Sequence, residues 1–325
     1  MLLGYGQLAI SKDVLATGQA TRKSEEMIGM GFKETLKKDL FVITTDVMAP
    51  KGTEASKSLA SLKDVKGIVH GVNSTDMPGA RLRAGSLAMS VKVKELGFDP
   101  ILQITCRDRN RLSLQSELLS ANMLGIKNVL VLRGDGMEKT DQPGAKAVFD
   151  LDSPEVLRAA RMLEKGLDLG GNPSNGTPSY CLGAALDPGA EDWELESKRA
   201  WQKAEEGAEF YQTQPIFNVD DFAKFLKRLG GIKIPILGGV FMLASAKMAW
   251  YLNQNVPGVN VPDEVIKIME SGDPVAKSID LAVRLVSDLK DLCSGVHIMM
   301  VTDWHHHIPE ILAQAGVRSV VDPTD

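Results

Sequence analysis

The sequence predicts an α/β fold of the (β/α)8 type, a single TIM barrel with an N-terminal helical extension. From residue 41 onward, eight short runs rich in β-branched residues alternate with segments of helical periodicity. This alternation is typical of βα units and a parallel sheet, and eight units favour a closed barrel over an open sheet. The length of 325 residues would also allow two ordinary domains. Dividing residues 41–325 among eight units gives roughly 36 residues each, which suits one barrel.

The predicted strands fall into two groups of four. The first four are FVITTDV (41–47), GIVHGV (67–72), ILQIT (101–105) and NVLVL (128–132). The second four are YCLGAAL (180–186), EFYQTQ (209–214), IPILGGV (234–240) and GVHIMMV (295–301). We therefore divide the chain into an extension, residues 1–40, and a barrel domain, residues 41–325.

Local signals fix the limits of two predicted helices. Ser153-Pro154-Glu155 supplies a cap and a first-turn proline, and Gly166 is the expected end of that helix. Asn218 or Asp220 caps a later helix, which ends at Gly230-Gly231. These signals predict helices after the fourth and sixth strands.

Three segments lie outside the regular βα pattern. Residues 1–40 are expected to form one or two amphipathic helices that cover the barrel bottom or reach a partner subunit. Residues 135–152 and 170–178 are rich in Gly, Pro and polar side chains, which predicts long loops. Long loops in compact domains often carry function.

The composition favours a globular protein that acts on a small molecule. Lys and Arg number 37 against 42 Asp and Glu, so no net positive field attracts nucleic acid or an anionic membrane. The three cysteines, Cys106, Cys181 and Cys293, form no disulfide or metal motif, which suits a reducing compartment. No signal-like N-terminus and no long apolar run is evident. We expect a cytoplasmic protein with no nucleic-acid partner and no membrane span.

Three carboxylates follow the predicted first, third and fourth strands. Asp46, Asp108 and Asp135 should project towards one rim, because TIM-barrel active sites lie at the carboxyl ends of the strands. A cluster of like charges would raise the pKa of at least one carboxyl and supply a general acid. The alternative is that each aspartate caps the next helix or pairs with a neighbouring arginine.

Two short motifs near the strand ends are further candidates. In Arg133-Gly134-Asp135-Gly136, glycine allows close approach of the backbone to a ligand, and arginine and aspartate can bind a phosphate and a ring N–H. The same residues also make an ordinary turn. His305-His306-His307 is a poor metal site, because consecutive residues do not face one side of a helix or strand. We expect no metal and at most one functional histidine.

Several of these segments together resemble the methylenetetrahydrofolate reductase family, over about residues 41–317. The segments are TTDVMAPKGTE (44–54), ILQITCRDRNRLSLQSELLSANMLGIKNVLVLRGD (101–135), PGAKAVFDLDS (143–153), GNPSNG (171–176), TQPIF (213–217) and IPILGGV (234–240). The block at 101–135 is the most specific. Ala49-Pro50-Lys51-Gly52-Thr53 is similar to the PPKGT-like sequence of the bacterial branch.

The resemblance implies a flavoprotein oxidoreductase of one-carbon metabolism and methionine biosynthesis. Such a barrel holds FAD, takes a hydride from NADH or NADPH, and converts 5,10-methylenetetrahydrofolate into 5-methyltetrahydrofolate, or the reverse. The implied general acid is Asp46, which would protonate the folate nitrogen released when the methylene bridge opens. Asp135 would lie beside the flavin and tune it, and Gln214 would contact the pterin.

The resemblance also implies a set of cofactor-binding positions. They are Ser74, Thr75, Gln103, Arg133, Gly134, Asp135, Leu186, Lys203 and Gln212, with Lys203 on the phosphate side and Ser74-Thr75 on the ribose side. Three positions depart from the family pattern. Asp46 stands where the family usually has glutamate, Gln103 where histidine is common, and Leu186 where an aromatic packs on the flavin.

These departures leave two other interpretations open. One is a flavin-free or altered oxidoreductase that binds a folate one-carbon carrier and uses another donor. The other is a non-catalytic folate-binding subunit of a larger complex. A homo-oligomer or a partner electron-transfer subunit is compatible with each.

Overall fold

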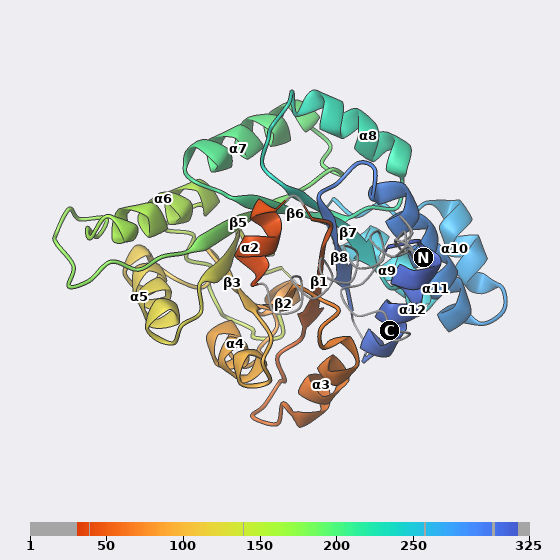
Figure 1. Cartoon of the computed structure of the whole chain (residues 1–325), viewed down its shortest axis with the longest axis horizontal. Coiled ribbons are helices and arrows are strands. Elements are labelled where there is room, and N and C mark those ends of the chain that lie inside the picture. The colour runs from red at the N-terminus through yellow and green to blue at the C-terminus, as the bar shows by residue number, and fades with distance from the viewer. Residues whose placement is uncertain (1–30, 39, 139, 257, 301–302, 318–325) are drawn as a thin grey trace, which may run out of the picture.

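The protein, seen as a computed structural model, is a closed barrel of eight parallel strands surrounded by helices (Figure 1). The structure describes residues 31–317 except 39, 139, 257, 301 and 302. The strands follow one another in chain order, and β1 pairs with β8 to close the ring. The predicted (β/α)8 barrel is therefore confirmed.

Each of the eight predicted runs overlaps a strand. The strands are β1 (Val42–Val47), β2 (Gly71–Ser74), β3 (Pro100–Thr105), β4 (Asn128–Leu132), β5 (Cys181–Leu186), β6 (Phe210–Pro215), β7 (Ile236–Phe241) and β8 (Gly295–Met299). The second one begins later than the predicted 67–72. Gly67 has φ +79° and the amides of Ile68 and Val69 donate to the Val65 carbonyl, so this segment forms a turn before β2 starts.

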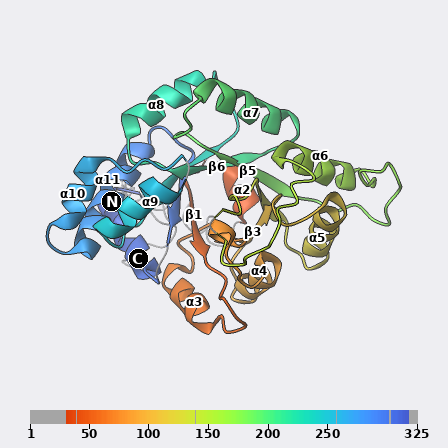
Figure 2. The same ribbon diagram turned by 180° about the vertical axis from the view of Figure 1, so that it is seen from behind.

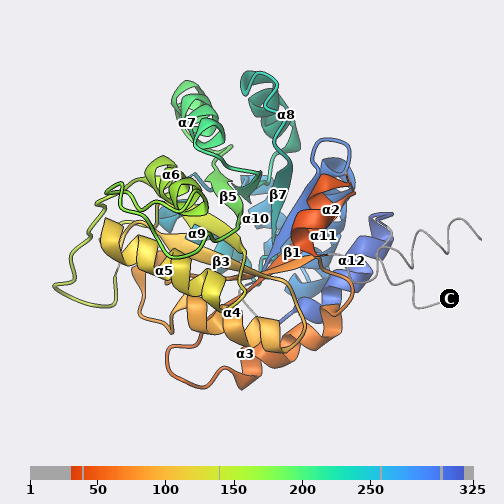
Figure 3. The ribbon, with the colours of Figure 1, turned by 60° about the vertical axis from the view of Figure 1, so that its left-hand side comes forward.

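Helices follow the strands and enclose the barrel (Figure 3). The α-helices are α2 (Phe32–Lys37), α3 (Ser56–Ala60), α4 (Ser86–Glu95), α5 (Arg111–Met123), α6 (Ser153–Glu164), α7 (Trp193–Glu205), α8 (Val219–Arg228), α9 (Ala246–Asn255), α10 (Asp263–Glu270), α11 (Pro274–Leu289) and α12 (Ile308–Gln314). Short 3₁₀ helices are η1 (Ser61–Val65), η2 (Pro78–Ala80) and η3 (His305–His307). Among the described residues, no helix combines the length and apolar character needed to cross a membrane.

Alternation along the strands divides the core into two layers. One face of each strand points into the barrel, where Phe32, Val42, Ile101, Leu130, Cys181, Phe210 and Leu237 fill the half nearer the amino ends. The other face packs against the helices, as Ile43, Val72 and Leu102 do. The face on which a residue lies therefore decides whether it can reach the barrel interior.

The described part of the extension closes the amino end of the barrel. Helix α2 lies across the centre of the ring of strands in Figure 1, and Figure 2 shows the molecule from the opposite side. The ring of Phe32 packs edge-on against that of Phe210, with centroids 4.9 Å apart. The Phe32 amide donates to Asp99 (2.7 Å). A helix covering the barrel bottom is thus found at residues 32–37, and the remaining prediction for residues 1–30 lies outside the described residues.

Helix α6 begins one residue earlier than the sequence signals indicated. Asp152, not Ser153, is the N-cap: its carboxylate accepts from the Glu155 amide (3.0 Å), and the Glu155 carboxylate accepts from the Asp152 amide (2.8 Å). This reciprocal capping box satisfies two amides that the helix itself cannot pair. Gly166, with φ +77°, follows the helix end as predicted, and Asn218 caps α8.

Asp152→Ala should lower the free energy of unfolding by about 1 kcal/mol, because it removes the carboxylate that accepts from the Glu155 amide. Urea denaturation measures the loss. Glu155→Gln is the matched control: it keeps an acceptor for the Asp152 amide and should change stability by less than about 0.5 kcal/mol. Equal losses for the two variants would contradict the assignment of Asp152 as the cap.

Candidate active site at the carboxyl ends of the strands

The barrel is open to solvent at the carboxyl ends of its strands. In seven of the eight strands, every residue is buried except one half-buried residue near the carboxyl end, on the face that points into the barrel. These seven residues, which we call the mouth ring, are Asp46, Gln103, Leu132, Ala185, Gln214, Phe241 and Met299. Active sites of TIM barrels lie at this end, so the mouth ring marks the candidate site.

Asp46 is the ionisable member of the mouth ring. Its Oδ1 accepts from the Met300 amide (2.8 Å), and no other residue in the described part of the chain bonds to its carboxyl. Burial raises the pKa of Asp46 to about 7, because desolvation outweighs the bond from Met300. The sequence predicted a raised pKa from neighbouring carboxylates, and the cause is instead desolvation. A carboxyl with this pKa can give or take a proton near neutral pH.

One of the three adjacent histidines lies beside Asp46. His305 is buried, its Nε2 lies 2.9 Å from the Asp46 carbonyl oxygen, and burial lowers its pKa. A neutral ring therefore donates from Nε2 to the Asp46 backbone. Within the described residues no group of three or more His, Cys, Asp and Glu side chains could hold a metal ion. The rings of His306 and His307 pack against each other at a tilt of 44°, with centroids 4.0 Å apart.

Four polar side chains lie one layer below the mouth ring. Gln212 and Asn73 exchange two amide hydrogen bonds (2.6 and 3.2 Å), and Gln212 also donates to the Thr44 hydroxyl (3.3 Å). That hydroxyl lies 3.0 Å from Nδ1 of His297. All four are buried, so the Gln212 amide is held within the barrel and does not line the mouth.

The loop after β2 is strained and is held by the loop after β4. Met77 (φ +46°) and Ala80 (φ +55°) adopt left-handed backbone that non-glycine residues seldom occupy. The Gly79 amide between them donates to the Asp135 carboxylate (2.6 Å), which is itself exposed. Buried Arg107 donates to the Met77 carbonyl (3.0 Å). Strained backbone persists where surrounding contacts enforce it, and it is frequent at ligand sites.

Asp108, one of the three predicted rim carboxylates, pairs with its neighbour. Arg107 reaches it with two nitrogens, Nε–Oδ1 at 2.9 Å and Nη2–Oδ2 at 2.8 Å. The alternative considered for this residue, pairing with an arginine, is the one found. A buried network lies next to it: Asp76 accepts from Arg109 (2.7 Å) and from the Thr105 amide (2.9 Å).

The Arg133-Gly134 turn leads from β4 into the long loop before α6. Gly134 has φ +90°, and a Cβ there would lie 3.0 Å from that of Arg107, so glycine is required. The exposed Arg133 guanidinium stacks over the Phe149 ring, 4.4 Å from its centroid. Phe149 also has a left-handed backbone, with φ +42°. The Arg133 guanidinium is therefore accessible to solvent, two residues before the exposed Asp135.

Besides Gln212, four predicted cofactor positions are buried and do not line the mouth. Ser74 and Leu186 are buried on the strand faces that point away from the barrel interior, and Leu186 belongs to the core beneath the helices. Lys203 lies on α7, where its amine donates to the Ala185 carbonyl (2.8 Å) and lies 3.6 Å from Glu196. Thr75 is buried, and its hydroxyl lies 3.5 Å from the Val47 carbonyl.

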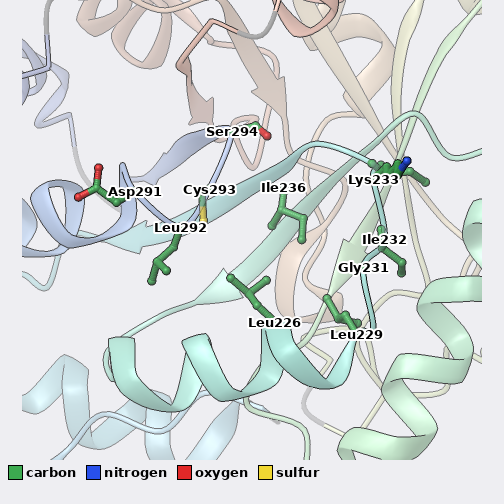
Figure 4. A pocket seen from close by; sticks show the side chains of 11 residues that line it. Leu226, Leu229, Gly231, Ile232, Lys233, Ile236, Asp291, Leu292, Cys293 and Ser294 are labelled. Atoms are coloured by element: carbon green, nitrogen blue, oxygen red, sulfur yellow. The ribbon is translucent and has the colours of Figure 1, made fainter.

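A cavity of about 390 Å³ lies at the other end of the barrel (Figure 4). It opens between the end of α8 and the starts of β7 and β8, lined mainly by Leu226, Leu229, Ile232, Ile234, Ile236 and Leu292. Residues at the amino ends of TIM-barrel strands serve stability rather than chemistry. This cavity is therefore separate from the candidate site.

Four members of the mouth ring were not predicted from the sequence. Leu132, Ala185, Phe241 and Met299 are apolar and drew no attention as chemical groups. Strand alternation could have found them, because Leu132 and Met299 are the last residues of their strands on the inward face. Asp46, Gln103 and Gln214, which were predicted from the sequence, are members of the ring.

The fold and the site define a class: a TIM-barrel protein with an open mouth that combines a protonatable carboxyl, two amides and apolar side chains. The sequence model of the family described as methylenetetrahydrofolate reductase matches residues 31–316. The chain belongs to that family, as its sequence segments suggested.

Named relatives agree with this membership. "Methylenetetrahydrofolate reductase 1" of Schizosaccharomyces pombe is 25% identical over 209 residues, covering 61% of this chain and 32% of that protein. "Probable methylenetetrahydrofolate reductase (NADPH)" of Caenorhabditis elegans is 29% identical over 229 residues, covering 68% of this chain and 33% of that protein. The matched part of the chain thus spans about a third of the length of these relatives.

A solved structure supports the fold independently. An uncharacterized Clostridium thermocellum protein, described as binding two copies of 5-methyl-5,6,7,8-tetrahydrofolic acid, superposes with a TM-score of 0.62. The match covers 87% of this chain and 96% of that one at 16% identity. At this identity the likeness concerns the barrel fold.

Proposed function

We propose that the mouth ring binds a reduced folate and that the protein interconverts 5,10-methylenetetrahydrofolate and 5-methyltetrahydrofolate, with FAD as hydride carrier and NADH or NADPH as electron donor. Family membership supports the reaction class. The observation that carries the proposal is Asp46, a carboxyl at the open end of the barrel whose pKa is raised to about 7. Opening the methylene bridge needs a proton at the departing nitrogen, and a carboxyl of this pKa holds one near neutrality.

The side chains around Asp46 suit a flat heterocycle. Leu132, Phe241 and Met299 offer apolar surface for the faces of a ring, and Gln103 and Gln214 offer amide donors and acceptors for its edges. In the proposed assignment Gln214 contacts the pterin, whose edge resembles an amide. The mixture of apolar surface and a few polar groups is the usual lining of a small-molecule site.

These residues also fit a flavin ring, which supplies hydride transfer when bound. Asp135 and Gly134 lie on the loop after β4, next to the exposed guanidinium of Arg133. In the proposed assignment this loop, and not Lys203, binds a phosphate or ribose of the cofactor. The Lys203 amine is already held by Ala185 and Glu196. Buried Cys106 and Cys181, both free thiols, are compatible with the proposed cytoplasmic location.

The proposal is tested by supplying the purified protein with FAD, methyltetrahydrofolate and an artificial electron acceptor. We expect continuous formation of methylenetetrahydrofolate that depends on added or co-purified FAD. Turnover without any flavin would favour an altered oxidoreductase with another donor. Tight binding of methyltetrahydrofolate with no turnover would instead show a folate-binding subunit, and neither result is compatible with the proposed function.

A further inference from the structure

His297 is a buried histidine that the proposed chemistry does not use. It lies on β8, on the face that points into the barrel, two residues before Met299 of the mouth ring. Its side chain is 3% exposed, and burial lowers its pKa to about 3. The ring is therefore neutral at any physiological pH, with one nitrogen carrying a proton and the other free to accept.

The layer of polar side chains below the mouth ring decides which nitrogen carries the proton. Both hydrogens of the Gln212 amide are used, one on Asn73 and one on the Thr44 hydroxyl. The Thr44 hydroxyl then has its own hydrogen to donate. Nδ1 of His297, at 3.0 Å, is closer to it than the Val296 carbonyl, at 3.4 Å. Nδ1 therefore accepts, and Nε2 carries the proton.

The Nε2–H of His297 has no acceptor among the described residues. Its ring is flanked by Thr44 on β1 and by Gly239 on β7, which has no side chain. A Cβ on Gly239 would lie 2.8 Å from the Met299 methyl, so the flexible Met299 side chain lies over this part of the barrel. Nε2 is not among the fully buried side-chain nitrogens that lack a partner, so it keeps access to the open end of the barrel, where a ligand can accept its hydrogen.

We propose that His297 contacts the ligand at the floor of the mouth, where its Nε2–H donates to a ring carbonyl oxygen of the bound heterocycle. A pterin and an isoalloxazine both carry such a carbonyl beside a ring N–H. This inference rests on the proposed function for the identity of the ligand. Thr44, Gln212 and Asn73 act as positioning residues, because they fix the tautomer that donates.

Two substitutions of His297 test the hydrogen bonds of its two ring nitrogens separately. In His297→Asn the amide oxygen takes the place of Nδ1 and can accept from Thr44, but the Nε2 donor is lost. In His297→Gln the amide nitrogen reaches the position of Nε2 and keeps a donor. The full-length protein and both variants are titrated by calorimetry with methyltetrahydrofolate and, separately, with FAD.

We expect His297→Asn to weaken binding of one of the two ligands about tenfold and His297→Gln to stay within about threefold of wild type. The ligand that responds identifies whether the pterin or the flavin receives the bond. Wild-type affinity of His297→Asn for both ligands would overturn the inference and leave the proposed function intact. A wild-type protein that binds neither ligand would overturn both.

Nitrogen NMR of histidine-labelled wild-type protein keeps the inference testable if a variant does not fold. We expect Nε2 of His297 to carry the proton in the free protein and its resonance to shift when the responding ligand binds. A proton on Nδ1, or an Nε2 signal unmoved by both ligands, would contradict the inference.

Discussion

Asp46→Asn should lower turnover of the folate by about 100- to 1,000-fold, the usual contribution of a general acid. The amide cannot exchange a proton with the folate nitrogen, but it keeps the size of the side chain and an oxygen for the Met300 amide. Steady-state rates with methyltetrahydrofolate and an acceptor measure the loss. Asp46→Glu, which restores the residue usual in the family, is the matched control and should retain turnover within about tenfold. Full activity of Asp46→Asn would refute the assignment.

The pH dependence follows from the same carboxyl. In the oxidation of methyltetrahydrofolate Asp46 must be deprotonated, so the wild-type rate should rise with pH up to about 7 and then level off. In the reduction of methylenetetrahydrofolate the protonated form is required, and the rate should fall above pH 7. The residual activity of Asp46→Asn should lack both transitions.

The stability of the fold should fall with rising pH, opposite to the rate of methyltetrahydrofolate oxidation. The pKa of Asp46 is about 7 in the folded protein and near 3.8 in the unfolded chain, so the folded state binds more protons between these values. The free energy of unfolding therefore falls as the pH rises through this window. At pH 8 Asp46→Asn removes a buried charge and should be more stable than wild type by about 4 kcal/mol. Denaturation at pH 4 should give no such difference.

Arg109→Met should destabilise the fold by about 3–5 kcal/mol, the cost of leaving a buried charge without its partner. The Asp76 side chain is 0% exposed and Arg109 is 11% exposed, and Arg109 joins Asp76 (2.7 Å) to Glu117 (2.7 Å). Without the guanidinium, Asp76 keeps only its neutral bonds to Thr105. Guanidinium denaturation monitored by circular dichroism measures the loss.

Arg111→Met is the matched control for that substitution. Arg111 also pairs with a carboxylate, Asp150, at 2.9 Å, but its side chain is 58% exposed. Water screens this pair, so its loss should cost no more than about 1 kcal/mol. If the two substitutions lowered the free energy of unfolding by comparable amounts, burial of the ion pair between Arg109 and Asp76 would not contribute to stability.

The order of strands and much of the mouth could be predicted from the sequence. Eight strand-like runs separated by helical segments predict the barrel, and the rule that chemistry lies at strand ends led to Asp46 and Gln214. Gln103 was added by the family resemblance. The β2 boundary was misplaced because Gly67 turns the chain in a run that is otherwise strand-like. Hydrophobic pattern alone does not reveal such a turn.

Residues near a strand end were harder to assign to one face. Ser74 and Leu186 are the last residues of β2 and β5, and a shift of one residue moves a side chain from the barrel interior to the helix side. Lys203 has a long side chain that folds back to a backbone carbonyl, which spacing cannot show. The pairing of Asp76 with Arg109 and the bond of Thr44 to His297 join segments remote in sequence, so only the folded chain reveals them.

The central claim is that folate and flavin exchange a hydride at the mouth around Asp46, and one measurement tests it most directly. The FAD-loaded protein is mixed anaerobically with methyltetrahydrofolate while the visible absorbance of the oxidised flavin is recorded. We predict that the absorbance is lost as an equivalent amount of methylenetetrahydrofolate forms, and that Asp46→Asn slows this loss at least 100-fold. Flavin that stays oxidised in the wild-type protein saturated with methyltetrahydrofolate would contradict the account.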